Sequence, residues 1–321
     1  EDGDVTASLG IFYDYAYSGP GVKVVEVMEG GPLDRPGMNV RPGAVITAID
    51  GVEIGPDIDF AALLNRKAGK NVLLSVRDPG ANADRQIVVK PITPAEENRL
   101  LYARWVKRNE EEVDRLSGGR LGYIHVPGMN DGAYRNTFEE VMGKFPHREG
   151  LVVDVRWNGG GDLVADLAMF LSGKKFFDYT TDTRSTGFEP NFRWTKPSVT
   201  ITNEAAYSDG HCFSWAYQHL GIGPLVGQAV PGTCTFAGWE VLQNGVRWGV
   251  PGMGVKDATT GRYLENWQTE VDVPVWNAYE LVSRGRDPQL EAAVDTLLEL
   301  VQVHASGAGA ADRGATDGGR N

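Results

Sequence analysis

The sequence predicts two folded domains in series, a small α+β domain followed by a larger α/β domain, with a helix between them. Three observations lead to this prediction. The first 92 residues alternate like short strands between turns rich in Gly and Pro, a helix start signal follows at Thr93, and the apolar runs after residue 120 do not alternate. The chain has 321 residues, which at roughly 150 residues per domain also fits two domains.

The changes in pattern define the expected boundaries. We expect residues 1–92 to form the first domain, 93–118 the connecting helix and 119–303 the second domain. Residues 304–321 contain Gly, Ala and polar residues without periodicity, so we expect this tail to be disordered.

The chain is acidic, with 31 Lys and Arg against 43 Asp and Glu and a formal net charge of −12. It has no basic run. Because binding to a phosphate backbone needs clustered Lys and Arg, the composition argues against nucleic acid as a partner. No apolar run reaches the roughly 18 residues of a membrane-spanning helix, so we expect no membrane insertion.

The chain has two cysteines, Cys212 and Cys234. Two are too few for a disulfide framework, and they lack the close spacing of a zinc knuckle. We interpret them as a buried thiol and an incidental one, and leave their pairing open. The sequence predicts no metal and no cofactor.

In the first domain, short apolar runs predict strands, and clusters of Gly, Pro and Asp predict the turns between them. The expected strands cover residues 9–12, 22–27, 45–49, 72–76 and 87–89. Residues 60–65 predict one short helix, and residues 30–34 predict a turn that enters another helix.

The connecting helix is predicted to begin at a capping box formed by Thr93 and Glu96, with Pro94 at the first helical position, where its missing N–H is tolerated. Apolar residues continue at helical spacing as far as Gly118 and Gly119, where we expect the helix to end. We interpret it as packed on the second domain.

In the second domain, apolar strand runs alternate with helical stretches. The expected strands cover residues 122–126, 151–155 and 198–202, and the expected helices cover 134–145, 163–171 and 209–220. Runs of Val, Ile and Leu that do not alternate are typical of strands covered on both faces, which predicts a mostly parallel sheet between helices.

The strand over 151–155 is followed by an Arg-Trp-Asn-Gly-Gly-Gly turn at residues 156–161. Glycines let a backbone approach a ligand closely and offer N–H groups to an anion. A simple strand-to-helix turn would explain the same pattern. The cluster is neither a dinucleotide fingerprint nor a P-loop, because neither spacing is present.

Ser208 lies between the expected strand over 198–202 and the expected helix over 209–220. This position borders a ligand crevice, with free N–H groups and the positive end of the helix dipole beside it. It suits a nucleophile whose oxyanion is held by the Asp209 amide and the glycine turn. The alternative is that Ser208 is only an N-cap, and spacing alone favours this alternative.

Four segments, in this order and at these intervals, resemble the catalytic domain of tricorn-type peptidases, which are related to the tail-specific processing proteases and have a crotonase-like core. They are residues 122–127 (Gly-Tyr-Ile-His-Val-Pro), 153–161 (Val-Asp-Val-Arg-Trp-Asn-Gly-Gly-Gly), 202–210 (with Asn-Glu and Ser-Asp-Gly) and 221–227 (Gly-Ile-Gly-Pro-Leu-Val-Gly). Ahead of them, residues 8–12 resemble the carboxylate-binding loop of a PDZ domain, and residues 43–51 resemble a PDZ strand. A PDZ domain before the catalytic domain is the order of this family.

The resemblance implies roles for individual residues. Ser208 matches the nucleophile, the Asp209 amide with Gly160 or Gly161 matches the oxyanion donors, and Glu265 matches the acid that orients the base. A solvated loop acid is the alternative for Glu265. The family's catalytic His belongs to a Thr-Ser-His segment upstream of the PDZ domain, which this sequence lacks. We therefore expect a C-terminal part of a larger enzyme with an incomplete site.

We expect no local residue to replace this base. His125 lies in an expected strand and His211 follows Ser208 by three positions, but a lone His in an apolar sequence is usually structural. The Ser/Lys branch of processing proteases is disfavoured, because no lysine occurs between Lys196 and Lys256.

The sequence as a whole predicts a serine peptidase that cleaves peptides or unfolded chains by acyl transfer. The PDZ-like domain would dock the substrate through Leu9, Gly10, Ile11 and Phe12, with amides in this loop reaching a terminal carboxylate. The resemblance also implies a homo-oligomer in the cytoplasm, with the periplasm as the alternative. The rival functions are an inactive peptide-binding scaffold of the same fold and a crotonase-fold acyl-CoA enzyme.

Overall fold

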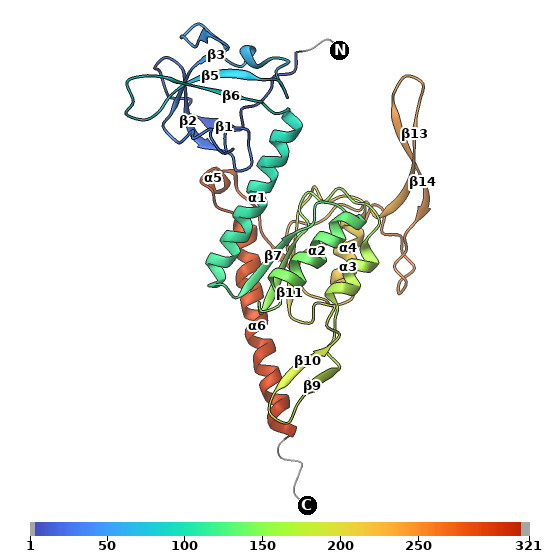
Figure 1. The fold of residues 1–321 in the computed structure, drawn as a ribbon. Helices are drawn as coiled ribbons and strands as arrows, with labels where there is room; N and C mark the ends of the chain where they lie inside the picture. The colour runs from blue at the N-terminus through green and yellow to red at the C-terminus, as the bar shows by residue number, and fades with distance from the viewer. Residues whose placement is uncertain (1–3, 316–321) are drawn as a thin grey trace, which may run out of the picture. The chain divides into compact units, whose positions relative to one another are not determined.

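The computed structural model describes residues 4–315 and divides the chain into two compact units, Glu1–Arg108 and Asn109–Asn321 (Figure 1). Each unit has its own cluster of buried apolar side chains. Helix α1 (Pro94–Ser117) contains the boundary between the units. It begins at a formed capping box, in which the Thr93 N–H donates to Glu96 Oε2 (2.8 Å) and the Glu96 N–H donates to Thr93 Oγ1 (3.2 Å).

The first unit is built around an antiparallel sheet in the order β1-β2-β3-β5-β6, with β4 paired to β3. Its elements are β1 (Ile11–Tyr13), β2 (Val22–Val27), β3 (Val45–Ile49), β4 (Val52–Glu53), the 3₁₀ helix η1 (Ala62–Leu64), β5 (Val72–Arg77) and β6 (Arg85–Val89). Alternate apolar residues of these strands face the core, as the period of a half-buried strand requires. The sheet agrees with the predicted α+β class.

Residues 30–34 do not enter a helix, so this part of the prediction is wrong. The segment folds into consecutive turns in which Asp34 Oδ2 accepts the Gly30 N–H (2.8 Å) and the Gly31 carbonyl accepts the Asp34 N–H (3.1 Å). These local bonds satisfy the backbone without a helix, and Pro36 follows, where it would oppose one. The helix expected over 60–65 is shorter than predicted and forms the single turn η1.

The second unit contains a five-stranded parallel sheet in the order β15-β12-β11-β8-β7, which confirms the predicted α/β class. The strands are β7 (Leu121–His125), β8 (Gly150–Asp154), β11 (Ser198–Thr202), β12 (Leu225–Gly227) and β15 (Val273–Pro274). The first four are buried along their whole length. The finer assignment to a crotonase-like core stays a prediction.

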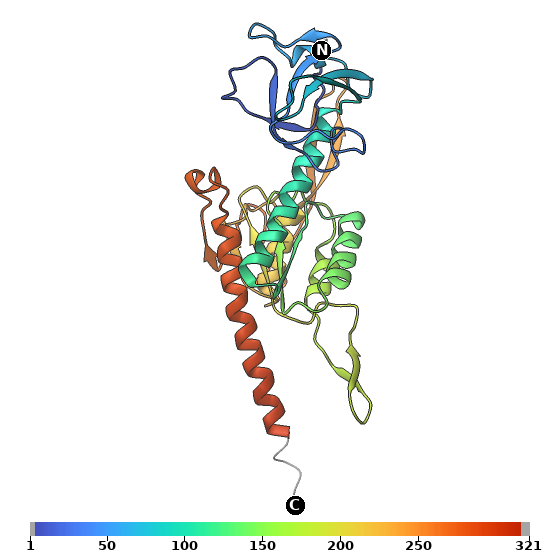
Figure 2. The same ribbon diagram turned by 60° about the vertical axis from the view of Figure 1, so that its left-hand side comes forward.

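Helices cover the two faces of this parallel sheet (Figures 1 and 2). On one face α2 (Asp131–Lys144), α3 (Val164–Leu171) and α4 (Asp209–His219) share a core with the strands, including Phe170 and Phe213. On the other face α6 (Pro288–Ala315) packs against β8, β11 and β12. The short helix α5 (Tyr279–Val282) precedes α6.

Two hairpins of the second unit were not predicted from the sequence. They are β9 (Phe177–Thr180) with β10 (Ser185–Glu189), and β13 (Thr235–Val241) with β14 (Arg247–Gly254). The second hairpin extends from the body of its unit in Figure 1. It exposes several large apolar side chains, among them Trp239, Val241 and Trp248. Such residues do not show the alternation that marks a half-buried strand, which explains why the pattern was missed.

The tail is helical over part of the range expected to be disordered. Helix α6 continues to Ala315, whereas residues 316–321 lie outside the described residues. Alanines recur between residues 305 and 315, and alanine is the strongest helix former, so they offset the glycines between them. Among the described residues, no helix is both long and apolar enough to cross a membrane.

Cys212 and Cys234, whose pairing the sequence left open, form a disulfide, so the interpretation as a buried thiol and an incidental one is wrong. Cys212 lies in the first turns of α4, and Cys234 immediately precedes β13. The two are 22 positions apart in the sequence, and the fold brings their Cα atoms to 5.0 Å. The proximity depends on tertiary packing between α4 and the segment before β13, which spacing alone does not show.

Candidate active site

Ser208 occupies a strained turn between strand β11 and helix α4. Its φ is 54° and its ψ is −116°, a region that side-chain-bearing residues rarely adopt. A strained strand-to-helix turn is also the geometry that exposes the nucleophile in α/β hydrolases. The side chain does not cap α4, and Ser208 Oγ has no hydrogen-bond partner among the residues that the structure describes. The hydroxyl is therefore not engaged as a helix cap.

Hydrogen bonds from three segments hold this turn in place. The Ser208 N–H donates to Thr233 Oγ1 (2.9 Å), and the Tyr207 N–H donates to the Asn158 carbonyl (2.9 Å). The Ser208 carbonyl accepts the His211 N–H at 2.9 Å. Because these partners come from the glycine turn, the segment before β13 and α4 itself, they can maintain a backbone conformation that is unfavourable in isolation.

The glycine turn after β8 packs directly against Ser208. A Cβ on Gly160 would lie 2.6 Å from Ser208 Cβ and 3.1 Å from the Asp209 nitrogen. The φ of Gly160 is 85°, and a Cβ on Gly161 would overlap the Met129 carbonyl at 1.7 Å. Both positions therefore require glycine, and the absence of a side chain at Gly160 lets the turn pack directly against Ser208.

The amides beside Ser208 differ in what they bind. The Gly160 N–H donates to Asn158 Oδ1 (2.8 Å), whereas the amides of Gly161 and Asp209 have no acceptor within the part of the chain that the structure describes. Asn158 is itself buried and donates through Nδ2 to the Val126 carbonyl (2.7 Å). The Asp209 amide is thus available to a ligand anion at the start of α4, and the Gly161 amide is free in the glycine turn.

The Asp209 side chain has a role that the sequence did not reveal. Its Oδ2 accepts the Leu163 N–H (2.7 Å) at the start of α3, so the residue links the first turns of two helices. Burial raises the pKa of Asp209, and the bonds from the Leu163 and Val164 amides counteract this effect only in part. The Asp209 carboxylate is thus engaged at the start of α3, and only the amide of Asp209 is free.

A buried charge cluster anchors the strand from which the glycine turn extends. Arg156 is fully buried and pairs with Asp154 (2.7 Å) and Asp287 (2.8 Å), and the Tyr123 hydroxyl donates to Asp154 Oδ2 (2.9 Å). Burial alone would raise the pKa of Asp154, but Arg156 lowers it below its ordinary value. Because each charge is paired, the cluster fixes the end of β8 without leaving an unsatisfied ion.

His211 is a structural residue, as expected. Its Nδ1 accepts the N–H groups of Thr233 (3.2 Å) and Cys234 (3.0 Å), and its Nε2 bonds to Thr269 Oγ1 (3.0 Å). Burial lowers its pKa to about 4, so the ring is neutral at pH 7. With both ring nitrogens occupied, His211 has no lone pair to offer the Ser208 hydroxyl.

His125 is held in a similar way at the end of β7. Its Nε2 donates to the Arg156 carbonyl (3.0 Å), and burial lowers its pKa. It therefore belongs to the buried cluster around Arg156. As the sequence led us to expect, neither His125 nor His211 is positioned as a local base.

Glu265 is not brought into contact with Ser208. It is exposed and has no hydrogen-bond or ion-pair partner among the described residues. The loop of Glu265 is nevertheless connected to the serine turn through one intervening segment. The Asn266 N–H donates to the Gly232 carbonyl (2.8 Å), and the next residue, Thr233, accepts the Ser208 N–H. A cavity of about 640 Å³ lies between these two segments, lined by Pro231, Gly232, Thr233, Asn266, Trp267, Gln268 and Glu270.

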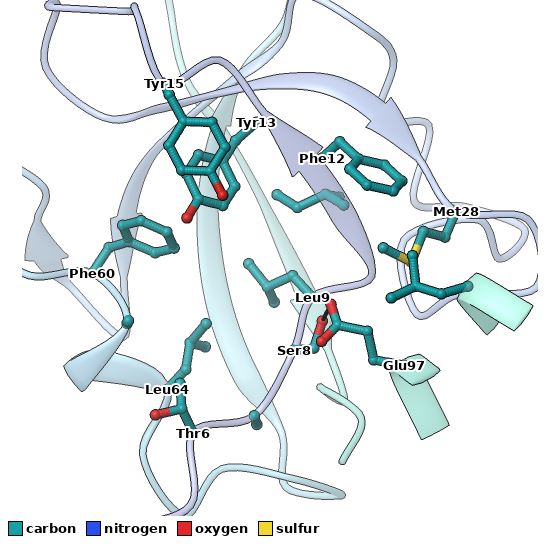
Figure 3. Close-up of a pocket in the computed structure, with 14 residues that line it drawn as sticks. Thr6, Ser8, Leu9, Phe12, Tyr13, Tyr15, Met28, Phe60, Leu64 and Glu97 are labelled. Carbon is teal, nitrogen blue, oxygen red and sulfur yellow. Dashed lines mark hydrogen bonds between the residues drawn. The ribbon is translucent and has the colours of Figure 1, made fainter. Parts of the chain in front are cut away.

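The four residues predicted to bind peptide lie in the first unit, around strand β1. Leu9, Ile11 and Phe12 line a cavity of about 410 Å³, together with Phe60 and Leu64 (Figure 3). Gly10 does not line it, but its positive φ of 65° forms the bend that precedes β1. The N–H of Gly10 donates to Ser8 Oγ (3.0 Å).

Comparison with known proteins identifies both units. Residues 20–94 match the tricorn protease PDZ domain, and residues 120–275 match peptidase family S41. Tricorn protease homolog 1 of Streptomyces coelicolor is 34% identical over 84% of this chain, and a tricorn protease homolog of Saccharolobus solfataricus is 31% identical over 91%.

The structural comparison agrees with the sequence comparison. The crystal structure of the tricorn protease superposes on 93% of this chain with a TM-score of 0.80 and 26% sequence identity. The chain spans only 25% and 27% of the lengths of the two homologues, and 29% of that crystallised chain. The chain therefore carries the PDZ domain and the S41 peptidase domain of the tricorn-type serine peptidases and belongs to that group.

Proposed function

We propose that this chain is the substrate-docking and nucleophile-bearing part of a tricorn-type enzyme that cleaves peptides or unfolded chains by acyl transfer. One observation carries the proposal: Ser208 is held in a strained turn with an unengaged hydroxyl, against Gly160 and beside the free amide of Asp209. A structural serine in an N-cap would use its side chain for the helix, and this one does not.

The chemistry follows from that arrangement. Ser208 Oγ attacks the scissile carbonyl carbon while its proton passes to a base, and the carbonyl oxygen becomes an oxyanion. The Asp209 and Gly161 N–H groups donate hydrogen bonds to this oxyanion, assisted by the dipole of α4. Collapse of the intermediate expels the amine, which takes a proton, and leaves an acyl-enzyme that water hydrolyses. Gly160 serves by its close approach, because its own amide is bound to Asn158.

The base is proposed to come from outside the described residues. His211 and His125 are both engaged in structural hydrogen bonds, as described above. We propose a histidine in another part of the full-length protein, since the homologues are three to four times as long as this chain. Glu265 would orient that histidine, because its exposed carboxylate is unpaired in the described structure and its loop adjoins the segment that binds the Ser208 amide.

The PDZ domain is proposed to dock an extended segment of the substrate. Among the residues that the structure describes, strand β1 pairs only with β2, so its other edge can add a peptide strand. The cavity lined by Leu9, Ile11 and Phe12 would receive an apolar side chain of that peptide. By analogy with the family we also propose a homo-oligomer in the cytoplasm.

Labelling with a fluorophosphonate probe tests the nucleophile. The full-length protein and this chain are each compared with their Ser208→Ala variants, and Ser283→Ala, at an exposed serine of the same unit, is the matched control. We expect the full-length protein to be labelled, Ser208→Ala to abolish the label, Ser283→Ala to retain it, and this chain alone to react weakly for lack of a base. Labelling that survives Ser208→Ala would remove Ser208 from the mechanism. An unlabelled full-length protein that still binds peptides would support the inactive scaffold.

A further inference from the structure

The PDZ-type loop that the resemblance assigns to a peptide carboxylate already faces a carboxylate of the protein itself. The Gly10 N–H donates to Ser8 Oγ (3.0 Å), and the Ser8 hydroxyl donates to Glu97 Oε1. Figure 3 shows the Ser8 and Glu97 side chains meeting at one end of the pocket. The Gly10 amide and the Ser8 hydroxyl are therefore both used within the protein.

The rest of the pocket is apolar or uncharged. Among the described residues that line it, Glu97 is the sole ionisable acid or base apart from the tyrosines Tyr13 and Tyr15. The apolar lining consists mainly of Leu9, Ile11, Met28, Phe60, Leu64 and Leu101. Such a cavity accepts an apolar side chain and presents one negative charge at its end.

The charge of Glu97 also acts on Tyr13, although it is a minor cause of the shift in the pKa of that side chain. Its pKa is raised to about 12, first by the hydrogen bond with Tyr15, with smaller contributions from burial and from the charges of Asp59 and Glu97. Two carboxylates therefore act on the ring of Tyr13, and both disfavour a further negative charge.

Arg104 lies beside the loop, but it does not offset the negative charge of Glu97. The Arg104 guanidinium lies 4.8 Å from the centre of the Phe12 ring, but Glu26 binds it in a bidentate ion pair at 2.7 and 2.8 Å. This pairing lowers the pKa of Glu26, as expected for a carboxylate fixed by a guanidinium. The pair offers a ligand little net positive charge.

We infer that this pocket selects an extended peptide that places an apolar side chain in the cavity and an adjacent Lys or Arg side chain against Glu97, rather than a free C-terminal carboxylate. The inference rests on the proposed docking role and specifies its ligand. The free edge of β1 aligns the peptide main chain, and a terminal carboxylate at the loop would meet Glu97 with the same sign of charge. The net charge of −12 adds a general attraction for basic peptides.

Fluorescence anisotropy with four labelled peptides tests the inference, in the full chain carrying Ser208→Ala so that no cleavage intervenes. The peptides share one apolar extended sequence. Three are amidated and carry Lys, Gln or Glu at the same position, and the fourth carries Gln and a free carboxylate. We expect the Lys peptide to bind about fivefold more tightly than the Gln peptide, and the two anionic peptides to bind more weakly. Added salt should narrow these differences.

Variants at Glu97 assign the preference to this residue. Glu97→Gln keeps an acceptor for the Ser8 hydroxyl and should bring the four affinities within about twofold. Glu97→Lys should favour the anionic peptides. The matched control is Glu53→Gln, which removes an exposed carboxylate of the same unit outside the pocket and should leave the preference unchanged.

Three outcomes would overturn the inference. In the first, the chain with Glu97 intact binds the free-carboxylate peptide most tightly. In the second, the preference for the Lys peptide persists in both Glu97 variants, and in the third, Glu53→Gln loses this preference. If none of the peptides binds, both the inference and the proposed docking role are wrong. The assignment of Ser208 is judged separately by the labelling experiment, so failure of the two proposals can be distinguished.

Discussion

The change Gly160→Ala tests the central claim that the glycine turn positions the nucleophile. The new Cβ would stand 2.6 Å from Ser208 Cβ, whereas non-bonded carbons pack at about 3.5–4.0 Å, so the two backbones must separate by about 1 Å. A misplacement of that size near reacting atoms costs about 100-fold in rate. The positive φ of 85° adds about 1 kcal/mol of strain, which lowers Tm by about 2–4 °C.

The assay compares the rate of fluorophosphonate labelling in the full-length protein with its thermal unfolding. Gly159→Ala is the matched control, because a Cβ there meets nothing within 4 Å and its φ is not in the left-handed region. We expect Gly160→Ala to react about 100-fold more slowly with only a small loss of Tm, and Gly159→Ala to react within about twofold of the parent. An unimpaired Gly160→Ala, or equal damage from Gly159→Ala, would refute the reasoning.

Three further predictions concern the segment that holds Ser208. The pKa of His211 is 6.5 in the unfolded chain and about 4 in the folded protein, so the unfolded state binds more protons between these two pH values. The free energy of unfolding, measured in urea, should therefore fall by about 3 kcal/mol as the pH drops from 6.5 to 4. The variant His211→Gln should show a weaker pH dependence. Replacing Cys212 and Cys234 together by Ser opens a 22-residue loop and should cost about 3 kcal/mol in the same measurement. Thr233→Val removes the acceptor of the Ser208 N–H and should cost about 1–3 kcal/mol and slow labelling.

Each of these predictions has a contrary result. A pH dependence that is the same with and without His211 would show that the ring is not held neutral by burial. Equal stability of the oxidised and Cys-free chains would mean that the disulfide does not constrain the unfolded state. A labelling rate unaffected by Thr233→Val would show that the Ser208 turn is maintained without this bond.

The proximity of the two turns of the candidate site could be predicted from the sequence because the carboxyl ends of parallel strands meet at one edge of a sheet. Strands β8 and β11 are neighbours, so the turn with Gly160 and the turn with Ser208 had to lie close together. The residues that hold these turns could not be predicted in the same way. Thr233 and the Asp209 carboxylate act across the fold, and nothing in the local pattern shows which amides they reach.

Glu265 and Glu97, the two acidic residues on which the proposals depend, could not be placed from the sequence pattern either. Glu265 lies in an exposed loop without periodicity, so its placement depended on the resemblance alone. Glu97 lies in the first turn of α1, and its contact with Ser8 spans 89 positions in the sequence. A side chain whose partner lies so far away is found only when the fold is known.

The disulfide near Ser208, the proposed nucleophile, depends on the redox conditions around the protein. Glutathione and thioredoxin keep the thiols of most cytosolic proteins reduced, whereas the periplasm maintains such bonds. The Cys212–Cys234 bond joins helix α4 to the segment that contains Thr233. Because α4 begins directly after Ser208 and Thr233 accepts the Ser208 N–H, loss of the disulfide would make the Ser208 turn less rigid. Thiol trapping in the native host therefore measures whether Cys212 and Cys234 are oxidised or reduced. Oxidised cysteines would indicate an oxidising compartment, and reduced cysteines would indicate a protein that works without this bond.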